Sequence, residues 1–184
     1  AVQVAPAEER TWPLFLKLAR ENKRFDRIRE VLLQQIERIQ AIELPGEREK
    51  AQLSTAYGWL AVVRDEGFSD LQGALDAYVG SVTADPLRAE RWAAFEAWAR
   101  RQGRQADFEN VIRKSCTQLR EQGQAPLPQL AAVDLVLQDP ATKLDEASRT
   151  LLAAVRAFPQ DSPSPVLVVF GWATKYLNDA YDHL

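Results

Sequence analysis

Apolar residues recur along the chain at intervals of three and four, which is the period of an α-helix that buries one face. The clearest stripe contains Trp92, Phe95 and Trp98. No segment alternates apolar and polar residues between two turns, as a half-buried strand would. The pattern therefore predicts an all-α protein.

Turn-forming residues divide this helical pattern into pairs of segments. Proline has no amide hydrogen to donate and disfavours helix at the residue before it, so Leu44-Pro45-Gly46 and Asp85-Pro86 each end a helix. Gly67 and Gly103 mark bends inside two of the pairs. The predicted units are residues 8–43, 50–86, 88–124 and 127–160, with an incomplete unit at 163–184.

The second helices of two units carry the same residue spacing. Ala147, Leu151, Ala154 and Pro159 repeat the spacing of Ala74, Tyr78, Ser81 and Pro86. The first helices restart at intervals of roughly 35 to 44 residues, close to the period of helical repeat proteins. Stacked repeats need the same pattern of small and large residues each time, which favours a repeat solenoid over an irregular helical bundle.

The stretch from Ala74 to Phe95 resembles the junction between two tetratricopeptide repeats. That family has the pattern W-x2-L-G-x2-Y, then A-x3-F and a closing proline. Here Ala74, Tyr78 and the Asp85-Pro86 stop are followed by Trp92-x2-Phe95. The resemblance implies a right-handed α-solenoid of about four and a half helix-turn-helix repeats, in one domain over residues 1–184. The tryptophan-rich first helices are also similar to the half-a-TPR subfamily, which scaffolds RNA-processing complexes.

Charge and hydropathy narrow the partners that we expect. The net charge is −3 and the pI is about 5.3, so nucleic acid is an unlikely partner. The longest apolar run, Val166 to Trp172, is far shorter than the roughly 18 to 20 residues that span a membrane. We therefore expect a soluble protein without a transmembrane segment in this chain. The compartment is left open, with the cytoplasm slightly favoured over the periplasm.

The sequence offers little for catalysis. Cys116 and His183 are the only cysteine and the only histidine; one falls inside a predicted helix and the other lies next to the last residue. They exclude a cysteine-rich zinc site, and no glycine-rich phosphate loop is present. Carboxylate pairs such as Asp145-Glu146 are typical of helix starts and solvated faces. We expect no enzymatic activity, no cofactor and no metal.

One basic row is a candidate peptide-binding site. The resemblance implies that the first helices line a concave groove, and Arg20, Arg64 and Arg100 occupy the same register near their ends, with Lys17 and Arg101 beside them. Guanidinium groups bind carboxylates in pairs of hydrogen bonds, so we expect a protein or acidic peptide that also carries apolar residues. The other interpretation is that these cations offset the helix dipole.

The last predicted helix is apolar around most of its circumference, which an exposed helix would not tolerate. Val166, Val169, Phe170 and Trp172 are therefore candidate interface residues, covered by a further repeat or by a partner. We expect this chain to be part of a longer array.

These observations favour a non-enzymatic scaffold that binds a partner peptide or protein on its concave groove. Two alternatives stay open. One is an RNA-processing or RNA-binding scaffold of the half-a-TPR kind. The other is a bacterial envelope assembly factor, similar to the repeat domains that accompany exopolysaccharide secretion.

Overall fold

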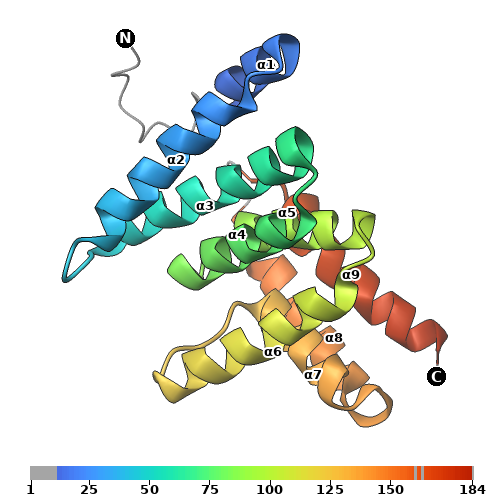
Figure 1. Ribbon diagram of the computed structural model, residues 1–184. Helices are drawn as coiled ribbons and strands as arrows, with labels where there is room; N and C mark the ends of the chain where they lie inside the picture. Colours follow the sequence, from blue (N-terminus) through green and yellow to red (C-terminus); the bar gives the residue numbers. More distant parts are fainter. Residues whose placement is uncertain (1–11, 160, 163, 184) are drawn as a thin grey trace. The chain divides into compact units, whose positions relative to one another are not determined.

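The computed structural model describes residues 12–159, 161–162 and 164–183, and this part of the chain forms nine α-helices and no strand (Figure 1). The all-α prediction is confirmed. The helices are α1 (Trp12–Asn22), α2 (Phe25–Gln40), α3 (Glu47–Phe68), α4 (Leu71–Ala84), α5 (Ala89–Arg101), α6 (Gln105–Glu121), α7 (Pro128–Gln138), α8 (Pro140–Ala157) and α9 (Val166–Asp182).

The helices fall into two compact units, Ala1–Asp85 with α1 to α4 and Pro86–Leu184 with α5 to α9. The boundary between the units is the Asp85-Pro86 dipeptide that follows α4. Four of the predicted repeat ranges each correspond to two helices, although α3 begins at Glu47, before the range 50–86; the range 163–184 contains α9 alone. The assignment of these ranges to one repeat domain stays a prediction, and we describe each unit by itself.

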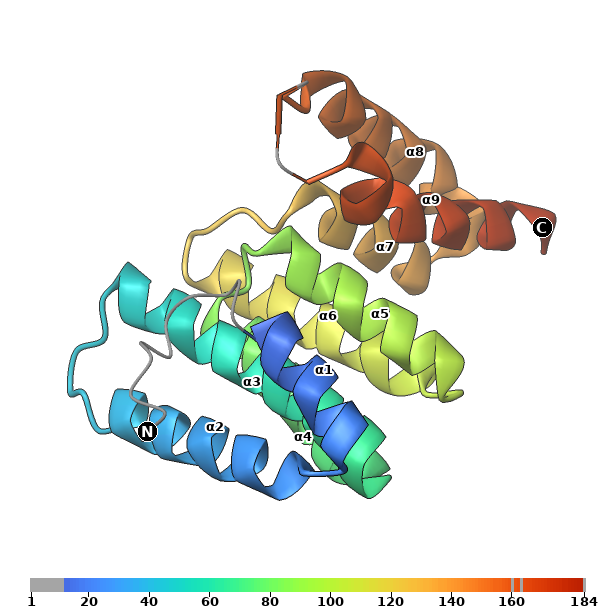
Figure 2. The same cartoon turned by 90° about the horizontal axis from the view of Figure 1, so that it is seen from above.

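The first unit is organised around α3. This helix contacts α1, α2 and α4, and it lies beside α2 in Figures 1 and 2. Ala56, Leu60, Ala61 and Val63 are almost fully buried on it, so α3 has no purely solvent-facing side over this stretch. A helix covered on several sides needs little amphipathic patterning.

Small residues allow α3 and α4 to approach closely. The Ser81 hydroxyl donates to the carbonyl oxygen of Ser54 at 2.7 Å, and both side chains are buried. Ala74, on the same helix as Ser81, is also fully buried. Ser54 and Ser81 therefore lie in the α3–α4 contact.

The same turn joins the two helices in the first three pairs. A residue with positive φ follows the first helix: Lys23 (53°), Ser69 (52°) and Gly103 (68°). In each pair the second helix begins two residues later, at residue 25, 71 or 105. The residue that follows the one with positive φ donates its backbone N–H to a carbonyl near the end of the first helix. This pattern is typical of α-helices that end with one residue in the left-handed conformation. These bonds are Arg24 to Ala19 (3.1 Å), Asp70 to Arg64 (3.0 Å) and Arg104 to Ala99 (2.7 Å).

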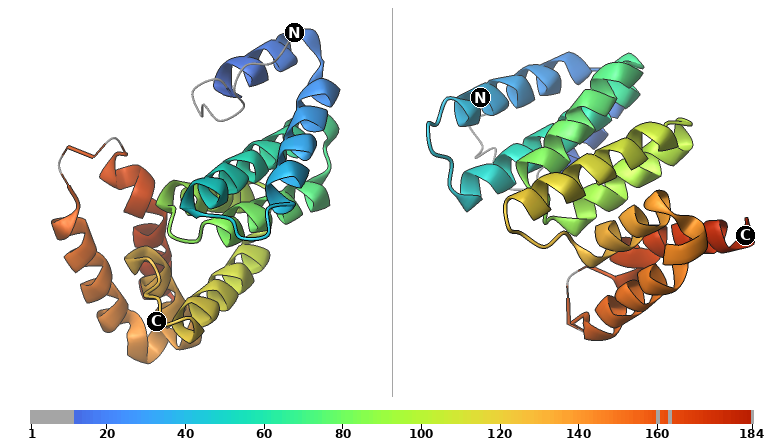
Figure 3. Two further views of the ribbon diagram at one scale, coloured as in Figure 1. Left: turned by 90° about the vertical axis from the view of Figure 1, so that its left-hand side faces the viewer. Right: turned by 90° about the horizontal axis from the view of Figure 1, so that it is seen from below.

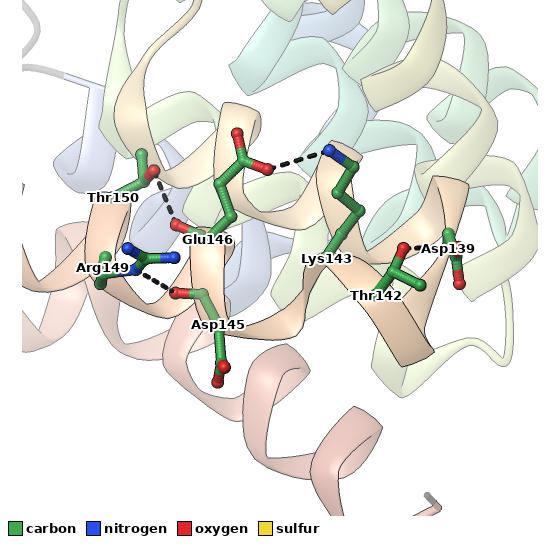
Figure 4. Close-up of polar contacts among 7 residues, drawn as sticks. All are labelled: Asp139, Thr142, Lys143, Asp145, Glu146, Arg149 and Thr150. Atoms are coloured by element: carbon green, nitrogen blue, oxygen red, sulfur yellow. Dashed lines mark hydrogen bonds and ion pairs between the residues drawn. The ribbon is translucent and has the colours of Figure 1, made fainter.

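The fourth pair is joined differently. Asp139 alone separates α7 from α8, and Pro140 is the first residue of α8, where its missing N–H costs nothing. The Thr142 hydroxyl donates to the Asp139 carboxylate at 2.5 Å, which lowers the pKa of that carboxyl group (Figure 4).

In the second unit, α9 contacts α8 and α7 and also packs back against α5 (Figure 3). In a linear stack of repeats, each helical pair contacts only the pairs next to it. The first helix of the fifth predicted repeat, α9, would then not contact the first helix of the third, α5. The α5–α9 contact departs from that order. The solenoid arrangement is therefore not confirmed.

Aromatic packing around Phe108 holds α5, α6 and α9 together. The Phe108 ring is fully buried, and it contacts the rings of Trp92, Phe95, Trp172 and Tyr176 at centroid distances between 5.1 and 6.3 Å. Three of these contacts are edge-to-face, the geometry that aromatic quadrupoles favour. Phe108 is therefore the centre of the second unit's core.

The recurring turn predicts opposite effects for two substitutions. Gly103→Ala adds a side chain where φ is positive and no neighbouring atom lies within 4 Å, so only backbone strain changes. We expect it to lower the free energy of unfolding by about 1 kcal/mol. Ser69→Gly relieves the same strain, and we expect a gain of about 0.5 kcal/mol. Urea denaturation monitored by circular dichroism measures the free energy of unfolding of both variants. Changes of the same sign in the two variants would contradict the common turn.

Candidate functional site

The predicted basic row is divided between the two units. Lys17 and Arg20 lie on α1 and Arg64 on α3, all in the first unit, whereas Arg100 and Arg101 lie on α5 in the second. The structure therefore brings together at most three members of the row within one unit.

Arg20 forms a two-pronged ion pair with Glu66. Its Nε donates to Glu66 Oε2 at 2.7 Å and its Nη2 donates to Oε1 at 2.6 Å, which links α1 to α3. The hydrogen bond to this carboxylate raises the pKa of Arg20. Both side chains remain partly exposed to solvent. Arg20 is thus held by its own chain in the way that a bound carboxylate would hold it.

Arg64 stabilises the turn between α3 and α4. Its Nη1 donates to the carbonyl oxygen of Gly73 at 2.9 Å, while the Asp70 carboxylate accepts from the Gly73 N–H at 2.9 Å as the N-cap of α4. A methyl group on Gly73 would lie 2.1 Å from an Asp70 oxygen and 2.8 Å from Arg64 Nη1. Arg64 therefore has a structural partner, and a larger residue at position 73 would displace the Asp70 and Arg64 side chains from this turn.

Arg100 is bound within its own helix. Its Nε donates to Glu96 Oε1 at 2.7 Å, its Nη2 contacts the same oxygen, and the Glu96 side chain is largely buried. Arg101 is exposed in the last turn of α5. Arg20, Arg64 and Arg100 thus all have intramolecular partners, and their role in peptide binding stays a prediction.

The outer face of α1, which we define as Leu14, Lys17 and Leu18, is the most open apolar surface of a first helix in the first unit. Leu14 is 56% exposed and Leu18 45% exposed, one helical turn apart, and Lys17 is exposed beside them. Trp12, Leu16 and Ala19 are buried on the other side of the helix. The face combines two apolar side chains with a positive charge.

The four candidate interface residues of α9 are mostly packed inside the second unit. Val169, Phe170 and Trp172 are buried, and Val166 is partly exposed. Phe170 packs edge-to-face on Phe158 at 5.4 Å. The large apolar residues that α9 leaves exposed near its start are Leu167 and Val168.

A partly buried polar cluster joins α5, α6 and α9, and the sequence did not reveal it. The Tyr176 hydroxyl donates to Glu109 Oε1 at 3.2 Å, and the Glu96–Arg100 pair lies close enough to act on Tyr176 electrostatically. Burial and the Glu109 carboxylate raise the pKa of the Tyr176 phenol, so it remains a hydrogen-bond donor. The contact spans 67 positions, so no local pattern signals it.

Cys116 does not have the environment of a nucleophile. The thiol is fully buried on α6. Its pKa is raised to about 12, mainly by burial and to a smaller extent by the nearby charge of Asp134. Asp134 is itself buried and accepts from Arg120 at 2.7 Å and from Gln138 at 3.0 Å. Within residues 12–159, 161–162 and 164–183, no group of three or more acidic, histidine or cysteine side chains is arranged to hold a metal ion.

The carboxylates expected on solvated faces lie on exposed helix surfaces where the structure describes them. Asp145 and Glu146 are exposed on α8, and Glu146 pairs with Lys143 at 3.0 Å (Figure 4). Glu47 begins α3. Glu8 and Glu9 lie outside the described residues.

None of the described helices is long and apolar enough to cross a membrane. No protein-family model, curated protein or solved structure matches this chain. The resemblance to tetratricopeptide repeats therefore rests on the residues alone.

The Arg20–Glu66 pair predicts a small, salt-sensitive coupling. In a double-mutant cycle with Arg20→Met and Glu66→Gln, we expect a coupling free energy of about 0.2 to 1 kcal/mol at low salt, because both groups are partly solvated. High salt should reduce it by screening. Lys17→Met, which removes a neighbouring cation on α1, is the control and should show no coupling to Glu66. A coupling that salt does not change would contradict this assignment.

Proposed function

We propose that the protein is a non-enzymatic interaction scaffold built from tetratricopeptide-like helical pairs, whose first helices carry the binding surface. One observation carries the proposal. The outer face of α1 presents Leu14 and Leu18 to solvent although the opposite side of the helix is well packed. A contiguous apolar surface that a fold leaves exposed can mark a site that meets a partner, and Leu14 and Leu18 lie next to each other on this face.

Two features of the fold support a repeat scaffold. The turn with positive φ recurs at the same point of the first three helical pairs, although Lys23, Ser69 and Gly103 differ in residue type. In the first unit, α3 packs against both helices of the preceding pair as well as against α4, as stacked pairs require. The right-handed solenoid is part of this proposal.

The chemistry of the α1 face indicates the kind of partner. Burying a leucine side chain contributes about 1.5 to 3 kcal/mol, whereas an exposed ion pair contributes about 0.2 to 1 kcal/mol. Leu14 and Leu18 would therefore supply most of the affinity, and Lys17 would orient the ligand. Because Glu66 already neutralises Arg20, the positive charge available on α1 is smaller than the sequence suggests. The ligand is a protein segment with apolar residues and a few carboxylates.

A peptide-array screen followed by fluorescence anisotropy tests this proposal. The array contains apolar peptides with aspartate or glutamate at varied spacing, and matched peptides with lysine at those positions. The acidic set should bind and the lysine set should not. Leu14→Asp with Leu18→Asp should weaken binding at least tenfold, which is about 1.4 kcal/mol. Leu44→Asp is the matched control, because Leu44 is 90% exposed between α2 and α3, and it should leave the affinity unchanged.

If Leu44→Asp and the α1 variant lose the same amount of binding affinity, the α1 face is not the binding surface. If the chain binds single-stranded RNA with an affinity that falls steeply with salt, the RNA-processing alternative replaces this proposal.

A further inference from the structure

The loop between α2 and α3, residues 41–46, presents an apolar side chain almost fully to solvent. Leu44 is 90% exposed, more than any other large apolar residue that the structure describes. Ile42 is 42% exposed, and Glu43 between them is exposed as well. The α2–α3 loop therefore offers two apolar side chains on either side of a carboxylate.

Both ends of the α2–α3 loop are held by backbone hydrogen bonds. At the end of α2, Ile42 donates its N–H to the carbonyl oxygen of Ile39 at 3.1 Å. At the start of α3, the carbonyl oxygen of Gly46 accepts from the Lys50 N–H at 3.0 Å. Pro45 restricts the residue before it to extended backbone. A short loop that is fixed in this way loses little conformational entropy when a partner covers its tip.

The chemistry of the loop matches the ligand that we propose for the α1 face. That ligand is a protein segment with apolar residues and carboxylates, and the loop carries Leu44 next to Glu43. The α1 face carries Leu14 and Leu18 next to Lys17. Contact between the leucines would remove apolar surface from water on both sides, and Glu43 and Lys17 have opposite charges. The two surfaces are therefore complementary in both apolar character and charge.

The two surfaces lie at opposite ends of α2 within the first unit (Figure 1). The helix α1 is joined to the first residue of α2, and the loop follows its last residue. Between them α2 has 16 residues, a length of about 24 Å. Leu14 and Leu44 both remain exposed, so the loop does not cover the α1 face of its own copy. A contact between the two surfaces would join two copies of the chain.

We infer that the protein associates with itself head to tail, with the α2–α3 loop of one copy packed on the α1 face of the next. This inference rests on the proposed function, because it names the ligand of the α1 face. Each copy contributes a different surface, so one α1 face and one loop stay free at the two ends of every assembly. Such a contact builds open chains that lengthen with protein concentration. It buries few side chains, so the association is weak and reversible.

Sedimentation velocity at increasing protein concentration tests this association. We expect the wild-type chain to form species larger than a dimer. Leu14→Asp with Leu18→Asp removes the α1 face, and Leu44→Asp removes the tip of the loop. Each of these two variants alone should associate at least tenfold more weakly than the wild type. An equimolar mixture of the two should form dimers and nothing larger, because it contains only one intact pair of surfaces.

Charge reversal tests the pairing of Lys17 with Glu43. Lys17→Glu and Glu43→Lys should each weaken self-association by about two- to fivefold, as expected for an exposed ion pair. The variant with both changes should regain the wild-type association, because the charges are again opposite. Glu121→Lys is the matched control: it changes the net charge equally at an exposed position of α6 and should leave the association unchanged.

Three results would overturn the inference. The wild-type chain could stay monomeric at every concentration, Leu44→Asp could associate as strongly as the wild type, or the mixture of variants could form no dimer. Peptide binding, measured below the concentration at which the chain associates, distinguishes this failure from that of the proposed function. If acidic peptides bind a monomeric wild-type chain through the α1 face, only this inference fails. If neither peptides nor a second copy bind that face, both fail.

Discussion

Burial of Phe108 among the rings of α5, α6 and α9 is the interaction on which the second unit depends. The side chain is fully enclosed and meets two aromatic residues from α5 and two from α9. Removing a buried phenylalanine side chain costs about 3 to 5 kcal/mol, comparable with much of the stability of a small domain. Through this contact α9 packs against α5 and α6 in addition to α7 and α8.

The first unit is held together in a different way. Its central contact joins small residues, Ser54 and Ser81, and its turns are fastened by backbone hydrogen bonds and by the Arg64–Gly73 contact. These interactions link helices that follow one another along the chain. In the second unit, by contrast, an aromatic cluster joins α9 to α5 and α6, which lie far from it in the sequence.

The sequence predicted the features that local chemistry determines. Helical periodicity, the proline stops and the bend at Gly103 placed the helices to within a few residues, because these signals lie close to the structure that they produce. The bend predicted at Gly67 lies two residues later, since α3 continues to Phe68 and Ser69 has the positive φ. The repeated turn was visible only at Gly103, since Ser69 adopts positive φ without a glycine. The Tyr176–Glu109 bond between α9 and α6 joins residues 67 positions apart, and no local spacing encodes it.

The candidate site was predicted less well than the fold. The sequence did not indicate the partners of Arg20 and Arg64, because Glu66 and the Gly73 carbonyl are brought to them by tertiary packing and by the α3–α4 turn. The partner of Arg100, Glu96, lies four residues earlier on the same helix. The apolar start of α9 was interpreted as a surface to be covered from outside, because a helix pattern does not say which neighbour covers it. The structure covers Val169, Phe170 and Trp172 from within the unit.

The position of α9 against α5 and α6 is therefore the central claim, and NMR tests it most directly. In a sample with labelled aromatic side chains, nuclear Overhauser effects should connect the Phe108 ring with the Trp172 indole and with the Tyr176 ring. The Phe95–Phe108 contact within the α5/α6 pair is the internal reference. If that reference is observed while Phe108 shows no contact with either ring of α9, the packing of α9 against α5 and α6 is contradicted.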